Sequence, residues 1–215
     1  LRSAPHQRVR FGGALVGRMP FDGGVIDLQL NGADEIFFER ADLRWCGGKL
    51  SGYALRLHPG LAEIDAVFYA DGIQLSRLFA LQTAIDGEAE AILYGKLPIA
   101  YKKGRIAYES GFLYAVPGAI GRLKLNNADM LTKNLPVGDP RIAQLSKAMK
   151  NLALDVFRVD LNGEGDTTHL DIRVKGRSAE DPELPPVNLN TSIEANVNDL
   201  LDISRGLMRL KNPQR

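Results

Sequence analysis

The chain has 215 residues, a formal net charge of +1, 45% hydrophobic residues and 25% charged residues, values typical of a soluble globular protein with one large domain or two small ones. The near-zero charge argues against a nucleic-acid partner, because phosphates require a basic surface. The single cysteine, Cys46, excludes an internal disulfide and a cysteine-rich metal site. We interpret it as a half-buried strand residue beside Trp45.

The start of the chain carries no targeting signal. It begins at Leu1 rather than Met, shows no charged-then-apolar leader, and contains no apolar run of the roughly 18 residues that a membrane span needs. We interpret the chain as a fragment of a longer precursor, in which residues 1–7 are a disordered or artificially added start and residues 8–215 form a single β-rich domain. Parts of the full-length chain outside this sequence would then make the membrane contact.

Most of the chain alternates apolar and polar side chains with a period of two, which is typical of β-strands with one dry face. Short turns such as Gly47-Gly48 separate consecutive runs, and this predicts antiparallel pairing. After a glycine-broken run over 8–19, strands are predicted at 25–30, 36–46, 49–57, 62–70, 87–95, 99–102, 105–110, 112–116, 120–125, 154–161, 168–176 and 187–195.

Three segments have helical spacing instead. The first is 74–82, with Ser76 near its N-cap. The second starts at Asp139-Pro140 and ends near 151, and the third opens at Asn198. With about ten strands at spacings of roughly 10–12 residues, these features predict a mainly β fold. We expect a long curved antiparallel sheet, groove-like (taco-like) or barrel-like, with about three short helices packed on it.

The segment 86–121 is predicted to lie in the middle of that sheet. It should form a long strand, a tight turn at Lys103-Gly104 and a strand that returns over its own start. Bends that let the sheet curve are expected at Pro98, Gly95, Gly104 and Gly111. Its tyrosines could stack on a sugar or line an apolar groove, but cross-strand aromatic pairing is the favoured interpretation for Tyr94, Tyr101, Tyr108 and Tyr114.

One turn resembles a calcium-binding loop. Oxygen ligands fall at positions 1, 3, 5 and 12 of such a loop, namely Asp160, Asn162, Glu164 and Asp171. However, the flanking residues have strand patterns and Asn162-Gly163 is a hairpin signal, so we favour a plain hairpin and predict no metal. Motifs for nucleophilic catalysis, phosphate loops and dinucleotide binding are missing from the sequence. We therefore predict no catalytic residue, no cofactor and no enzyme activity.

Four stretches of sequence carry a family resemblance when taken in order: GGKLSGYALRL, AVFYADGIQLSRLFAL, IDGEAEAILYGKLPIAYKKGRIAYESGFLYA and NLNTSIEANVNDLLDISRGL. They resemble the C-terminal region of the YdbH-like family, which is distantly similar to the AsmA and TamB proteins and carries an old label of dicarboxylate transport. The resemblance extends from about Arg8 to Leu210.

The resemblance implies a large Gram-negative envelope protein, anchored in the inner membrane and reaching through the periplasm toward the outer membrane. Its curved sheet would hold a hydrophobic groove for the acyl chains of phospholipids in transit. A small outer-membrane lipoprotein is an implied partner that would add a strand to the sheet. The family implies no catalytic residue. An alternative is a periplasmic binding or assembly module for a small dicarboxylate-like ligand or a partner protein.

Strand alternation alone names the apolar residues that would line such a groove. They are Ile26, Leu28, Leu30, Ile64, Phe68, Leu170, Ile172, Val174, Leu189 and Ile193. Each buried methylene of an acyl chain would contribute roughly 0.8 kcal/mol. An open apolar groove would favour lipid, whereas a closed pocket with converging Arg or Lys side chains would favour a small acid.

Overall fold

The computed structural model describes residues 2–16, 19–58, 63–81, 86–102, 105–119, 121–126, 140–164 and 167–195. Their main feature is one sheet of 12 strands in the order β1-β4-β5-β6-β7-β9-β10-β12-β11-β8, with β13 and β14 continuing from β12. Every neighbouring pair is antiparallel. The prediction of a mainly β fold with a long antiparallel sheet is therefore confirmed.

The long strands of the sheet are β1 (Gln7–Phe11), β4 (Gly23–Leu30), β5 (Ile36–Trp45), β6 (Gly48–His58), β7 (Glu63–Gln74), β9 (Ile92–Lys102), β10 (Arg105–Ala115), β12 (Leu152–Glu164), β13 (Thr167–Ser178) and β14 (Val187–Ala195). Short strands β8 (Gly87–Glu90) and β11 (Arg122–Leu125) branch from the start of β12, and β2 (Ala14–Val16) pairs with β3 (Met19–Phe21) in a separate hairpin. The helices are α1 (Leu75–Ala80) and α3 (Pro140–Met149).

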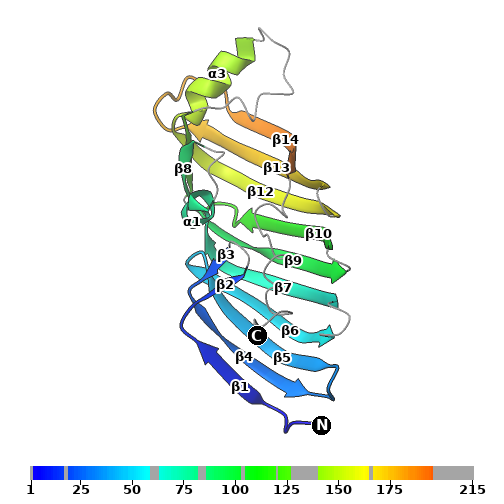
Figure 1. Ribbon diagram of the computed structural model, residues 1–215. Coiled ribbons are helices and arrows are strands. Elements are labelled where there is room, and N and C mark those ends of the chain that lie inside the picture. Colours follow the sequence, from blue (N-terminus) through cyan, green and yellow to red (C-terminus); the bar gives the residue numbers. More distant parts are fainter. Residues whose placement is uncertain are drawn as a thin grey trace, which may run out of the picture.

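The sheet is open rather than barrel-like. Its long strands lie side by side in one elongated, curving layer from β1 to β14 (Figure 1). Among the described strands, β1 pairs only with β4 and β14 only with β13, so each leaves an unpaired edge. The barrel-like closure that the sequence left open is therefore wrong, and the groove-like alternative fits the observed topology.

The described residues contain two helices, where the sequence predicted three. The helix predicted from Asn198 lies outside the described residues. Helix α1 begins at Leu75, after Gln74, whose side chain makes no capping hydrogen bond. The predicted cap at Ser76 is wrong because the backbone N–H of Leu75 donates to the carbonyl of Ala91 instead, so the β8–β9 junction satisfies this donor.

The hairpin between β5 and β6 turns one residue earlier than predicted. Trp45 pairs with Gly48, so Cys46 and Gly47 form the two-residue turn, and both have positive φ, of 47° and 77°. This is the backbone geometry that a tight hairpin with right-handed strand twist requires. Cys46 is thus a buried turn residue rather than a half-buried strand residue.

Extra residues in several strands account for the curvature of the sheet, since a bulge bends its strand and increases its twist. The register shifts within the β5, β6, β7, β10 and β12 pairings. Bulged residues Ala54, Gly72 and Ser110 have positive φ. The backbone N–H of Ser110 donates to Oδ1 of Asn162 at 2.8 Å, which fixes the β10 bulge to the neighbouring strand.

The gap expected between strands 87–95 and 99–102 is absent, because β9 runs through Pro98 and pairs it with Val67 of β7. Proline has no N–H to donate, and on the β10 side it lies where the register shifts between Tyr108 and Phe112. Gly95 has a different role: a Cβ there would lie 2.0 Å from the carbonyl oxygen of Phe112. Gly95 thus allows close approach of β9 and β10, while Gly104 and its turn lie outside the described residues.

Candidate functional site

The register of the sheet gathers its apolar side chains on one face, because directly paired residues point to the same side. One row runs from Ile26 through Ala41, Gly52 and Phe68 to Leu97. A second row runs through Leu113, Val159, Ile172 and Thr191 on β10 to β14. We call this side the inner face. Among the described paired positions of the sheet, none on the inner face carries a charged side chain.

All ten predicted groove residues lie on the inner face. They form two groups, one on β4 and β7 and one on β13 and β14, with β9, β10 and β12 between them. Direct cross-strand pairs join Leu170 to Ile193 and Val174 to Leu189. The first group is Ile26, Leu28, Leu30, Ile64 and Phe68, and the second is Leu170, Ile172, Val174, Leu189 and Ile193.

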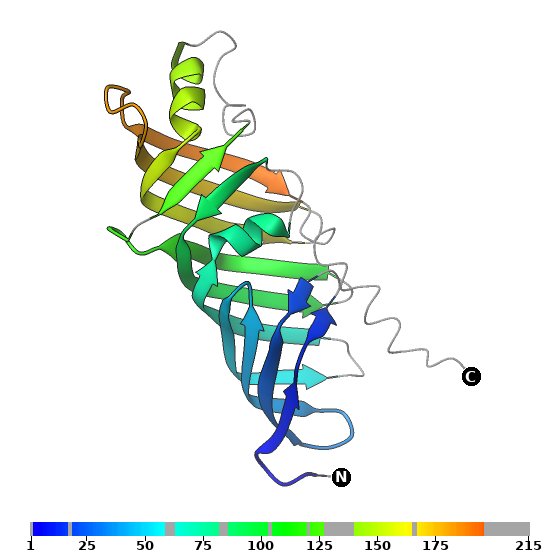
Figure 2. The same ribbon diagram turned by 90° about the vertical axis from the view of Figure 1, so that its left-hand side faces the viewer.

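One end of the inner face is packed. Ile73, Met149 and Leu152 have no exposed surface and Leu93 has 1%. Both helices lie at this end of the strands, and Figure 2, which faces it, shows α1 with the short green strands β8 and β11 in front. Val174 and Leu189 belong to this core. Two of the ten predicted groove residues are therefore part of the core, and Phe68 and Ile172 pack against it. We call this region the packed end.

The other end of the inner face mixes half-buried residues with buried ones, among them Leu55, Ala66, Tyr108 and Thr168. It holds Leu28 and Leu30 at one side of the sheet and Leu170 and Ile193 at the other. Between them, Ile64 packs on the small cluster of Ala41, Leu55 and Ala66. No described helix covers these strand halves (Figures 1 and 2). We call this region the open end, and contact of its residues with a ligand stays a prediction.

Two buried hydroxyls lie on the inner face. Tyr108 and Thr168 are 6% and 0% exposed, and within the described structure their hydroxyl oxygens have no hydrogen-bond partner. Both lie in one row, with Gly163 of β12 between them. Burial raises the pKa of the Tyr108 hydroxyl, so it stays protonated. The alternation pattern gave no signal for them because Tyr and Thr are common strand residues.

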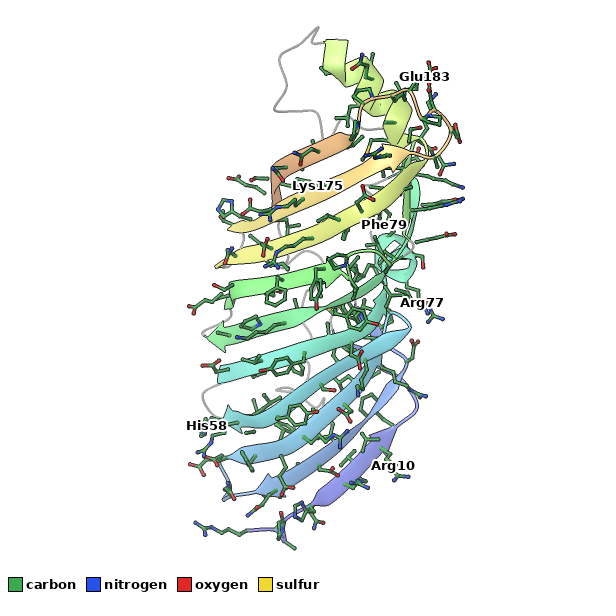
Figure 3. The ribbon with its side chains drawn as sticks, turned by 180° about the vertical axis from the view of Figure 1, so that it is seen from behind. Arg10, His58, Arg77, Phe79, Lys175 and Glu183 are labelled. Carbon is green, nitrogen blue, oxygen red and sulfur yellow. The ribbon has the colours of Figure 1, made fainter. Side chains whose placement is uncertain are left out.

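The opposite, outer face is charged and aromatic; Arg10, His58 and Lys175 lie on it in Figure 3. Arg8 and Asp27 form an ion pair, with Nε 2.6 Å from Oδ1, and the hydrogen bond from Arg8 lowers the pKa of Asp27. Tyr94 and Tyr114 form a cross-strand pair with ring centroids 6.4 Å apart. The favoured interpretation of aromatic pairing is therefore confirmed for this pair, whereas Tyr108 lies on the inner face.

The calcium-loop pattern falls on the β12–β13 hairpin. Asp160 lies directly opposite Asp171 on paired strands. Arg158 donates to both carboxylate oxygens of Asp160 at 2.9 Å, and Asp171 accepts from the Ser192 hydroxyl. The hairpin favoured from sequence is formed, but Asn162 and Gly163 do not make its turn, because they pair with His169 and Thr168 inside the ladder. A group of three or more His, Cys, Asp or Glu side chains placed to hold a metal is not found among the described residues.

None of the helices in the described part of the chain is both long and apolar enough to cross a membrane. A family model described as "YdbH-like: Intermembrane phospholipid transport protein YdbH" matches residues 1–206. Searches of curated proteins and of solved structures give no significant match.

Proposed function

The chain belongs to the YdbH-like family, and from that premise we propose that its inner face shields phospholipid acyl chains as they pass between the inner and outer membranes. Family membership supports a role in lipid transport in the cell envelope, with phospholipid as the cargo. The proposed role is non-enzymatic, because it requires a surface that excludes water rather than a group that reacts.

The observation that carries the proposal is the uncharged inner face of an open sheet. It is continuous from Ile26 on β4 to Ile193 on β14, strand by strand. Apolar contact is non-directional and scales with the area removed from water, at roughly 0.8 kcal/mol per methylene. Such a face can hold an acyl chain at many equivalent positions, which permits movement along it.

In this proposal, the two ends of the inner face have different roles. The packed end, around Ile73, Leu93 and Leu152, holds the strands together. The open end, from Leu28 and Leu30 to Leu170 and Ile193, offers the surface to the lipid. The alternative of a small acidic ligand is not favoured, because a dicarboxylate would require cations, and the described paired positions on the inner face carry none.

The proposed location is the periplasm, with an inner-membrane anchor in another part of the parent protein and this region toward the outer membrane. A partner such as the small lipoprotein implied by the resemblance would add its strand at an unpaired edge, β1 or β14. The exposed backbone groups of such an edge bond to any extended chain of suitable register.

Native mass spectrometry of the purified chain with phospholipid, followed by lipid extraction, tests the proposal. Ile193→Asp places a charge on the open end of the inner face, and Asn188→Asp places the same charge on the outer face of the same strand. We expect lipid on the wild type and on Asn188→Asp, and little on Ile193→Asp. A wild type without lipid, or a folded Ile193→Asp variant with undiminished lipid, would overturn the proposal.

A further inference from the structure

An open depression of about 830 Å³ lies over β9, β10, β12, β13 and β14. Its side chains come mainly from the outer face: Lys96, Phe112, Arg158, Asp160, Arg173 and Asn190. We propose that this depression binds a carbohydrate chain that carries acidic groups. This inference does not depend on lipid binding at the inner face.

An aromatic and guanidinium platform forms one side of the depression. The Arg158 guanidinium lies over the Phe112 ring, 4.7 Å from its centroid. Tyr114 lies beside Phe112, with ring centroids 6.2 Å apart, but outside the lining of the depression. Planar groups of this kind pack against the C–H faces of a sugar ring, which combine apolar area with weakly polarised hydrogens.

Fixed polar groups surround the platform. Arg158 is held by two hydrogen bonds to Asp160, which lower the pKa of that carboxyl and keep it an acceptor. Asp171 is held by the Ser192 hydroxyl, and Asn162 by the N–H of Ser110. Neighbouring donors and acceptors in fixed positions match the adjacent hydroxyls of a sugar, and because they are already ordered, less entropy is lost on binding.

The charge pattern favours an acidic ligand. The lining includes three cations, Lys96, Arg158 and Arg173, and two carboxylates, Asp160 and Asp171, which leaves a net charge of 3 − 2 = +1. Arg158 lies directly opposite Arg173 on the paired strands, an arrangement that destabilises a sheet. Arg158 has a direct partner in Asp160, whereas Arg173 forms no ion pair within 4 Å with a described residue and acts on Asp160 only at longer range, where it helps to lower the pKa of that carboxyl. A bound carboxylate would relieve the repulsion between the two guanidinium groups.

The size of the depression favours a chain over a single small molecule. Lys96 on β9 and Arg173 on β13 are three strand steps apart in the sheet order, or roughly 14 Å at about 4.8 Å per step. An acyl chain would make little contact there. The aliphatic residue of the lining is Ile172, and its side chain lies on the inner face. The depression and the inner face therefore suit different ligands.

Isothermal titration calorimetry of the purified chain with tetragalacturonate, chitotetraose and tetraglutamate tests the proposal. We expect tetragalacturonate to bind most tightly, chitotetraose more weakly and tetraglutamate weakest. Arg173→Gln should weaken tetragalacturonate binding about tenfold with a smaller effect on chitotetraose, since it removes one charge-assisted contact. Phe112→Leu should weaken the binding of both tetragalacturonate and chitotetraose.

Tyr53→Leu is the matched control, because Tyr53 is an aromatic residue of the same face, 52% exposed and outside the depression. It should leave binding unchanged. The proposal is wrong if neither sugar binds at millimolar concentration, or if Arg173→Gln and Phe112→Leu, shown to be folded by circular dichroism, bind as the wild type does. Binding of tetraglutamate as tight as that of tetragalacturonate would also overturn it, because the surface would then recognise charge alone.

Discussion

The packed end and the open end of the inner face are built from the same residue types on the same strands, yet they differ in burial. Ile73, Leu93 and Leu152 are at most 1% exposed, whereas Leu28 and Ile193 are half-buried. Among the described elements, α1, α3, β8 and β11 cover the packed end (Figures 1 and 2), although Tyr108 and Thr168 at the open end are also buried. Apolar alternation in a strand therefore predicts a dry face, but not whether protein or a ligand keeps it dry.

Truncation at the packed end should have the largest effect. Leu152→Ala, at a side chain with no exposed surface, should lower the free energy of unfolding by about 2–5 kcal/mol, because it removes buried methylenes and leaves a cavity. Leu28→Ala at the open end should cost less than half as much. Urea denaturation of both variants measures the difference, and equal losses would contradict the division into two ends.

Reactivity of Cys46 offers a second probe of the packed end. Burial raises the pKa of this thiol to about 11, so near neutral pH it holds about a hundredfold less thiolate than an ordinary cysteine. Alkylation by iodoacetamide at pH 8 should be at least that much slower in the folded chain than in urea. Leu152→Ala should accelerate labelling and Leu28→Ala should not; comparable rates in the two variants would show that Cys46 does not report on the packed end.

Two glycines at the centre of the sheet, Gly95 and Gly111, differ in how closely the neighbouring strand approaches them. A Cβ at Gly95 would lie 2.0 Å from the carbonyl oxygen of Phe112, whereas one at Gly111 would find its nearest neighbour at 3.4 Å. Gly95→Ala should therefore cost roughly 1–3 kcal/mol through overpacking. Gly111→Ala should be nearly neutral or stabilise by up to about 1 kcal/mol, since it restricts the unfolded chain. Thermal unfolding compares them, and similar melting temperatures would refute the close approach of β9 and β10.

The outer face should show the smallest effect and a dependence on pH. Arg158 lowers the pKa of Asp160 by hydrogen bonding, so the pair stabilises the fold above the ordinary carboxyl pKa of about 4 and loses that contribution as pH falls through the lower folded-state value. Asp160→Asn should cost only a few tenths of a kcal/mol near neutral pH, because the pair is partly exposed. Urea unfolding at several pH values should show the difference from wild type shrinking in acid, whereas a constant difference would exclude the ion pair as its cause.

Much of the fold was predictable because alternation is a local signal. It identified most strands and placed Leu28 and Ile193 on one face, as the register shows. The failures are positions where a distant segment decides the local structure. The N–H of Leu75 bonds to Ala91 rather than to a nearby side chain, and β9 continues through Pro98 because the β10 register shifts beside it.

The outer depression could not be predicted for the same reason. Arg158 and Arg173 are brought opposite each other only by the register of β12 with β13. Lys96 lies near them only because β10 separates β9 from β12 in the sheet order. The branching of β11 and β8 from β12, which covers the packed end, also has no local sequence signal. Tyr108, Gly163 and Thr168 likewise come into one row only through the register of β10, β12 and β13.

The central claim is that the open end of the inner face carries acyl chains, and photo-crosslinking in the full-length parent protein tests it most directly. A benzophenone amino acid placed at Leu170 would face inward, and one placed at the adjacent His169 would face outward. After irradiation of growing cells, mass spectrometry should find phospholipid attached at position 170 and little at position 169. Equal adducts at both positions, or none at position 170 in a folded protein, would contradict the claim.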